Sequence, residues 1–209
     1  MNRINFVRGT FAALCLAAVS GNPAVAQPGG VEIAGVRYPV AVSLAGSNLV
    51  LNGAGIRYRF VIQVYTAGLY LGAKADTPDA VLAAPGPKRL AVTMLREIDA
   101  NELGRLFTRG MQDNAAKDEF SKSIPGTLKL ADIFSARKKL LKGDSFSVDF
   151  VPGSGTTIVI NGKAAGEPIV EPEFFKALIR IWLGPNPADD GLKQALLGSE
   201  SGGLRTRRQ

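Results

Sequence analysis

The alternation of apolar and polar residues in the first part of the chain predicts β-strands. Between positions 31 and 71 the apolar residues come in short runs or alternate with polar ones, which is the period of a strand. Ala34-Gly35 and residues 45–48 interrupt this pattern and predict tight turns. Residues 58–71 carry apolar side chains at both odd and even positions, so we expect one long strand covered on both faces.

The apolar spacing becomes helical after residue 99. Asp99 and Glu102 have the spacing of a capping box, which predicts the start of a helix. Four apolar residues then recur at helical spacing: Leu103, Leu106, Phe107 and Met111. Residues 119–141 predict a second helix with a break at Pro125-Gly126, because proline removes a helical hydrogen bond.

The remaining segments predict two more β elements and three more helices. Residues 88–95 predict a strand and residues 146–160 a hairpin, while residues 77–82 predict a short helix. A longer helix begins at Glu171-Pro172 and ends before Gly184-Pro185, and a short one follows Asp189.

This order of elements predicts the fold class. Strands, then helices, then a hairpin, then helices are typical of an α+β domain, an antiparallel β-sheet with helices packed on one face. We expect a single domain over residues 27–198.

The first 26 residues predict a secretory signal peptide. Arg3 and Arg8 precede a short apolar run, and Ala24-Val25-Ala26 supplies the small residues of a cleavage site. The run is shorter than the roughly 20 residues that span a bilayer, and an uncleaved anchor is the alternative. We therefore expect a periplasmic or secreted protein without stable membrane insertion after cleavage. We expect the polar, basic tail at residues 199–209 to be disordered.

Missing residue types exclude several chemistries. The chain has no histidine, and its only cysteine, Cys15, lies in the expected signal peptide. Ser-His-Asp triads, Cys-His pairs, ordinary zinc sites and disulfides in the mature chain are therefore excluded. We expect no metal and no cofactor. The formal net charge of +7 owes much to arginines of the signal peptide and the tail, so we expect no nucleic-acid binding.

One segment carries a family resemblance. Residues 51–71, LNGAGIRYRFVIQVYTAGLYL, join a Gly-Ala-Gly-Ile-Arg block to a Thr-Ala-Gly-Leu-Tyr-Leu strand end. Tyr38-Pro39 stands upstream, and the strand LAVTML, the hairpin and a helix ending in Trp-Leu-Gly follow downstream. In these features the chain resembles the chalcone isomerase fold family, and most of all its exported bacterial branch.

The resemblance implies a cleft with two catalytic residues. Arg57 would hold an attacking phenolate and stabilise negative charge, which a guanidinium can do without transferring a proton. Thr66 would bind the ketone through a water. A bulge or turn near residues 55–58 is needed to bring both side chains into one cleft. The family's catalytic tyrosine has no counterpart, since Leu103 stands near its place.

Further residues are candidates for ligand binding. In the family's fatty-acid-binding branch an arginine and a tyrosine hold the ligand carboxylate, and Tyr65 would be that tyrosine beside Arg57. Arg96 is either a second clamp on an acidic ligand or a surface partner of Glu97. Leu103 and Phe107 are core residues that would also line an apolar cleft between helix and sheet. The alternative for Arg57 is a solvated charge or a bridge to a carboxylate.

Three functions remain open. The first is a binding protein for a small amphipathic or aromatic anionic ligand, a fatty acid or a phenolic acid, with Arg57 at its head. The second is an isomerase of the intramolecular-lyase type, with Arg57 and Thr66 as catalytic residues. The third is a structural or partner-binding protein without a ligand. We favour the first because it does not require the missing tyrosine.

Overall fold

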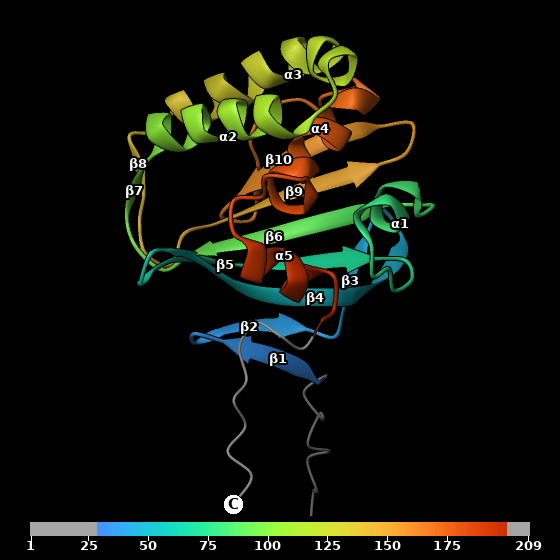
Figure 1. Cartoon of the computed structure of the whole chain (residues 1–209), viewed down its shortest axis with the longest axis vertical. Helices are drawn as coiled ribbons and strands as arrows, with labels where there is room; N and C mark the ends of the chain where they lie inside the picture. The colour runs from blue at the N-terminus through green and yellow to red at the C-terminus, as the bar shows by residue number, and fades with distance from the viewer. Residues whose placement is uncertain (1–28, 200–209) are drawn as a thin grey trace, which may run out of the picture.

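A seven-stranded antiparallel sheet forms the centre of the molecule (Figure 1). The computed structural model describes residues 29–199; the expected signal peptide and all of the expected tail after Ser199 lie outside the described residues. In spatial order the strands are β11 (Lys163–Ala164), β10 (Gly155–Ile160), β9 (Ser145–Val151), β6 (Lys88–Met94), β5 (Ile62–Leu71), β4 (Ser47–Arg59) and β3 (Ala41–Leu44).

The helices gather on one face of this sheet, which confirms the predicted α+β class. Helices α2 (Ala100–Asn114) and α3 (Lys117–Ser135) run side by side, and both contact α4 (Pro172–Leu183) (Figure 1). The short helix α5 (Asp190–Leu196) packs on β4, and α1 (Pro78–Ala83) contacts α4. A small two-stranded sheet, β7 (Ile98–Asp99) and β8 (Lys139–Leu140), lies at the edge of the molecule near the start of α2. Among the described residues, no helix is both long enough and apolar enough to cross a membrane.

A small hairpin covers the other face of the sheet. It consists of β1 (Gly30–Ile33) and β2 (Val36–Pro39), joined by the predicted Ala34-Gly35 turn. Tyr38 of β2 is buried, and its ring lies directly on Gly68, where a side chain would collide with it. Tyr38 packs with Leu49, Leu51 and Tyr70 in a second, smaller apolar cluster. The central strand β5 is therefore covered on both faces, as expected.

Aromatic side chains fill the main core between sheet and helices. Phe107 lies with its ring centroid 5.4 Å from that of Phe134 and 5.8 Å from those of Phe146 and Trp182. These rings meet edge-on or tilted, an arrangement that aromatic pairs favour. All four side chains are at most 4% exposed, so this part of the interior is densely packed.

The predicted helix starts are confirmed where a side chain caps the helix. The Asp99 carboxylate accepts a hydrogen bond from the Glu102 N–H at 2.9 Å at the start of α2. Thr77 caps α1 and Asp189 caps α5 in the same way. A cap acts within one helical turn, which is why the local sequence is enough to place it.

The prediction of one long strand over residues 58–71 is wrong. The chain turns back at Phe60-Val61, so β4 ends at Arg59 and β5 begins at Ile62. Neither residue is a usual turn former, and both are at least 90% exposed. Because the turn residues are themselves apolar, the pattern of apolar residues gives no sign of a turn at this position.

The glycines that precede Arg57 form no turn. Gly53 and Gly55 lie within strand β4, whose pairing with β5 shifts register once between Leu51 and Gly53 and again between Arg57 and Tyr58. A side chain at Gly55 would come within 2.6 Å of Ala195 on α5. These glycines therefore allow α5 to approach the strand closely.

The predicted break at Pro125-Gly126 is also wrong, because α3 continues through both residues. Gly126 faces α4, and a side chain there would come within 2.6 Å of Ile169 and 2.7 Å of Phe174. The contact between α3 and α4 thus stabilises a helix whose proline removes one hydrogen bond.

Two helical glycines should respond to substitution in opposite ways. Gly126→Ala should lower the free energy of unfolding by about 1–3 kcal/mol, since the core around it would be overpacked. Gly104→Ala should raise it by up to about 1 kcal/mol, because alanine favours a helix and its side chain would meet Phe134 at an ordinary 3.8 Å. Urea unfolding followed by circular dichroism measures both. Shifts of the same sign in the two variants would contradict this account.

Candidate functional site

Arg57 and Tyr65 form a cross-strand pair on the helix-covered face of the sheet. The register of β4 and β5 sets them directly opposite each other. The Arg57 Cζ lies 5.6 Å from the centroid of the Tyr65 ring, within the range of a cation–π contact. The two residues proposed to hold an anionic head are thus adjacent.

A cavity of about 190 Å³ opens beside this pair. Helix α2 forms one wall, while the end of α4 and the following segment form another. The lining residues are Arg57, Tyr65, Leu103, Leu106, Phe107, Arg109, Gly110, Asp113, Ile181, Asn186 and Ala188. Apolar side chains with a few polar groups are the usual lining of a small-molecule site.

Two polar groups at the cavity lack a full set of partners. The Arg57 Nε is buried and has no hydrogen-bond partner within residues 29–199. The Tyr65 hydroxyl accepts a hydrogen bond from the Trp182 Nε1–H at 2.8 Å, and no described residue accepts its own proton. A buried donor without a partner is costly, so these two groups are suited to receiving an acceptor from a ligand.

Tyr65 remains a donor over the whole ordinary pH range. Burial raises the pKa of Tyr65 to about 12, although Arg57 and the Trp182 hydrogen bond act in the opposite direction. A phenol with such a pKa keeps its proton at neutral pH and offers it to a carboxylate or carbonyl oxygen.

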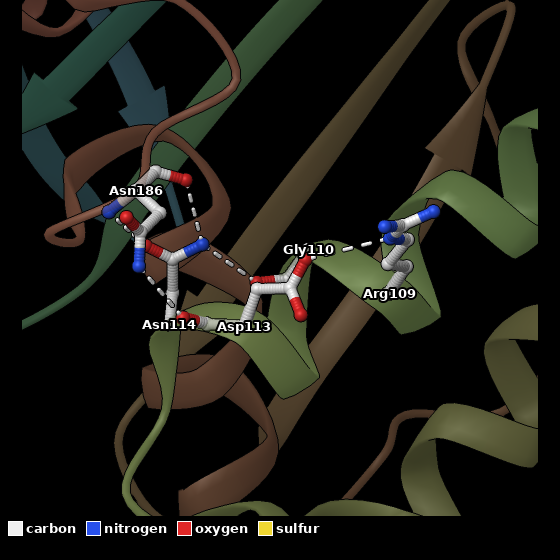
Figure 2. Close-up of polar contacts among 5 residues, drawn as sticks. All are labelled: Arg109, Gly110, Asp113, Asn114 and Asn186. Carbon is white, nitrogen blue, oxygen red and sulfur yellow. Dashed lines mark hydrogen bonds and ion pairs between the residues drawn. The ribbon is translucent and has the colours of Figure 1, made fainter.

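Carboxylates also lie near the cavity. Asp113 lines it and forms an exposed ion pair with Arg109, with 3.6 Å between Arg109 Nε and Asp113 Oδ2 (Figure 2). The Asp189 carboxylate accepts hydrogen bonds from the N–H groups of Tyr58 and Leu192, both at 2.8 Å. Each of these carboxylates therefore already has a donor, whereas the Arg57 Nε–H has no acceptor among residues 29–199.

Asn114 holds the segment after α4 in place as a cavity wall. Its side-chain amide donates to the carbonyls of Gly110 and Asn186, both at 2.8 Å. Its Oδ1 accepts from the Asn186 N–H at 2.7 Å, and Asn186 donates in turn to the Asp113 carbonyl at 3.2 Å (Figure 2). One buried side chain thus joins the end of α2 to the loop that carries Asn186 and Ala188.

Thr66 does not share the cavity with Arg57, contrary to the expectation of a common cleft. Thr66 pairs with Ile56, the neighbour of Arg57, so its side chain emerges on the opposite face of β5. There its hydroxyl accepts a hydrogen bond from Tyr38 at 2.8 Å and is fully buried. The irregularity expected near residues 55–58 is present as a register shift between Arg57 and Tyr58, where Val64 of β5 is the extra residue. It lies beyond the Ile56–Thr66 pair and leaves the Thr66 side chain on the opposite face.

Of the other predicted site residues, two line the cavity and one does not. Leu103 and Phe107 line the cavity, as expected of an apolar wall. Arg96 follows the end of β6, is exposed and is not part of the lining. Its expected surface partner, Glu97, pairs instead with Lys139 at 3.0 Å.

The sequence did not single out several residues that line the cavity. Ile181 has the helical spacing of a core residue, and Arg109 and Asp113 have that of a solvated helix face, so nothing separates them from structural residues. Asn186 and Ala188 lie in an irregular segment after α4. A pattern within one element gives no signal for a cavity that several elements enclose.

Two other features do not define a site. A groove of about 660 Å³ between α2 and α3 is larger, but its lining is mostly exposed and polar, including Asn101, Arg105, Gln112 and Asp132. Within residues 29–199 no three Asp or Glu side chains are grouped in a way that would hold a metal ion.

Comparison with known proteins identifies the family and the fold. The chalcone isomerase-like family model matches residues 30–198, so the chain belongs to this family. Among solved structures, a fatty-acid binding protein of Arabidopsis thaliana is similar with a TM-score of 0.63 and 15% identity. The match covers 78% of this chain and 92% of the plant protein. At that identity the likeness concerns the fold. None of the curated proteins matches the sequence significantly.

Removal of the Asn114 side chain should loosen the cavity wall. Asn114→Ala would leave the Asn186 N–H and two carbonyls without their partner, and the free energy of unfolding should fall by about 1–3 kcal/mol. Gln112→Ala, an exposed position on the same helix, is the control and should change it by less than about 0.5 kcal/mol. Urea unfolding compares them; an equal, small effect in both would show that the Asn114 contacts contribute nothing.

Alkaline pH should destabilise the protein through its buried tyrosines. Burial raises the pKa of Tyr38, Tyr65 and Tyr70 to about 12, against about 10 in an unfolded chain. Because the unfolded chain loses these protons first, the contribution to stability is complete below pH 10 and is lost as the pH rises through 12.

Melting temperatures between pH 8 and 12 measure this effect. At pH 8 the melting temperature of Tyr65→Phe should be lower than that of the wild type, since the Trp182 N–H loses its acceptor. Between pH 10 and 12, however, the variant's melting temperature should fall less than that of the wild type. A parallel decline in wild type and variant would exclude Tyr65 as a source of the pH dependence.

Proposed function

We propose that the protein binds a small amphipathic carboxylate, such as a short fatty acid or a phenolic acid. The carboxylate lies at Arg57 and Tyr65, and the apolar part of the ligand lies against Leu103 and Phe107. The observation that carries the proposal is the buried Arg57 Nε without a partner, beside a cavity of about 190 Å³. A guanidinium forms short, charge-assisted hydrogen bonds with a carboxylate, and the Tyr65 hydroxyl supplies a further donor.

The cavity volume favours a small ligand. An apolar cavity of about 150 Å³ holds benzene, whereas sites for larger, drug-sized ligands measure about 300–1,000 Å³. The densely packed rings of Phe134, Phe146 and Trp182 lie behind Phe107 and leave no obvious extension. A long acyl chain would therefore have to leave through the mouth of the cavity or displace Phe107.

Binding explains the geometry better than catalysis of a cyclisation does. Arg57 of β4 and Thr66 of β5 have their side chains on opposite faces of the sheet, so they cannot act on one substrate in the cavity. The solved plant structure that resembles this fold is described as a fatty-acid binding protein, which supports the same choice. The proposal includes the export predicted from the first 26 residues, which would have the protein act in the periplasm or outside the cell.

The Arg57→Leu substitution tests the proposal. In calorimetry with octanoate, a phenolic acid and palmitate, the wild type should bind octanoate or the phenolic acid better than palmitate. Arg57→Leu should weaken that binding at least about tenfold, because a charge-assisted hydrogen bond contributes about 1.5–3 kcal/mol. The matched control is Arg105→Leu, an exposed arginine of α2 outside the cavity, which should bind as the wild type does.

Stability separates this role from a structural one. Within the described residues Arg57 forms no ion pair and only a cation–π contact with Tyr65, so Arg57→Leu should keep its melting temperature within about 2 °C. A fall of several degrees would indicate a structural arginine. Equal affinity in both variants would contradict the proposal, and Arg57-dependent turnover of a 2′-hydroxychalcone would favour the isomerase instead.

A further inference from the structure

The tip of the β4–β5 hairpin exposes a run of apolar side chains. Phe60 is 92% exposed and Val61 90%, while Tyr58 and Ile62 are 40% and 47% exposed. Four large side chains within five residues make this hairpin tip (residues 58–62) unlike an ordinary polar turn. Isolated exposed apolar residues are common, but a contiguous group indicates an interaction surface.

The backbone conformation of the turn makes a phenylalanine at position 60 unfavourable in free energy. Phe60 has φ +58°, in the left-handed region that bulky side chains rarely adopt. The other two-residue hairpin turns between residues 29 and 199 are Ala34-Gly35, Ala45-Gly46 and Asn161-Gly162, all with the glycine that such turns favour. An exposed phenylalanine in a strained turn gives the folded chain no packing in return, so its role must lie outside the fold.

Arginines flank the hairpin tip. Arg59 precedes Phe60, and the Leu95 N–H donates to the Val64 carbonyl at 3.0 Å, which sets the end of β6, with Arg96, beside the start of β5. Both arginines are exposed, and neither forms an ion pair or side-chain hydrogen bond with any residue from 29 to 199.

The nearby carboxylates do not neutralise these arginines directly. Glu97 pairs with Lys139 at 3.0 Å. Asp189 accepts hydrogen bonds from two backbone N–H groups, one of them at Tyr58. The hairpin tip is therefore an exposed apolar surface beside two arginines, Arg59 and Arg96, that have no acidic partner within residues 29–199.

We propose that this hairpin tip docks the protein on the surface of an anionic lipid bilayer. Phe60, Val61 and Ile62 would enter the boundary between headgroups and acyl chains, while Arg59 and Arg96 would contact lipid phosphates. Apolar side chains flanked by cations are the usual composition of such peripheral contacts. The hairpin tip is an exposed turn, so its side chains can enter a fluid interface without a matching groove.

The docking does not depend on the proposed ligand, but it has a consequence for it. Arg57 and Tyr65 lie on the same hairpin, a few residues from the tip. A docked protein would hold the mouth of the cavity near the interface, which is where amphipathic carboxylates collect.

Phe60→Asn tests the docking. Asparagine tolerates the left-handed conformation, so the variant should fold and its melting temperature should rise, by about 2–4 °C if the strain is about 1 kcal/mol. Its affinity for vesicles of mixed phosphatidylglycerol and phosphatidylcholine should fall about tenfold, the loss expected for one apolar anchor. The affinity of Arg96→Gln should fall about fivefold, and that of the wild type should fall with added salt.

Leu128→Gln is the matched control. Leu128 is 62% exposed on α3, so this substitution, like Phe60→Asn, removes a large exposed apolar side chain. It should leave vesicle binding unchanged. Every variant carries the same termini, so the comparison isolates the hairpin tip from the basic tail.

Three results would overturn the docking. Equal vesicle binding by the wild type and Phe60→Asn would show that the hairpin tip is not the anchor. Equal binding to pure phosphatidylcholine vesicles would show that the arginines play no part. A dimer in light scattering that dissociates in Phe60→Asn, without any vesicle binding by the wild type, would identify the hairpin tip as a contact between copies of the chain.

Discussion

The contact between Arg57 and Tyr65 is the constraint on which the site depends. The register of β4 and β5 sets the two residues opposite each other, and the Trp182 N–H holds the Tyr65 hydroxyl from the helix side. A permanently charged guanidinium thereby lies half-buried beside an aromatic face, with its Nε unsatisfied. Such an arrangement costs free energy in an isolated protein, and an anionic ligand would recover it.

The packing around this pair limits what the site can hold. Phe107 lines the cavity on one side and packs against Phe134, Phe146 and Trp182 on the other. The same aromatic cluster that stabilises the main core therefore closes the cavity. A small volume, one guanidinium and one phenol are features that suit a compact carboxylate.

The hairpin of β4 and β5 carries both the proposed ligand site and the proposed membrane contact. Its tip carries exposed apolar side chains in a strained turn, and its body carries the arginine and the tyrosine of the cavity. The strained turn at Phe60 and the buried Arg57 Nε without a partner both cost free energy, and no contact within the described chain offsets it. Costs of this kind tend to concentrate where a protein meets its ligand or its partner.

Local sequence determined the features that depend on a few neighbouring residues. The caps at Asp99 and Asp189, the Ala-Gly turns and the α+β order follow from side chains acting within a turn or from the apolar period. The family resemblance singled out Arg57. Tertiary structure alone decided which face each strand residue occupies, because a shift of one position in the register reverses it. It therefore separated Thr66 from Arg57. It also kept Gly53 and Gly55 in a strand under α5 and carried α3 through Pro125 against α4, because close packing between distant segments outweighed local preference.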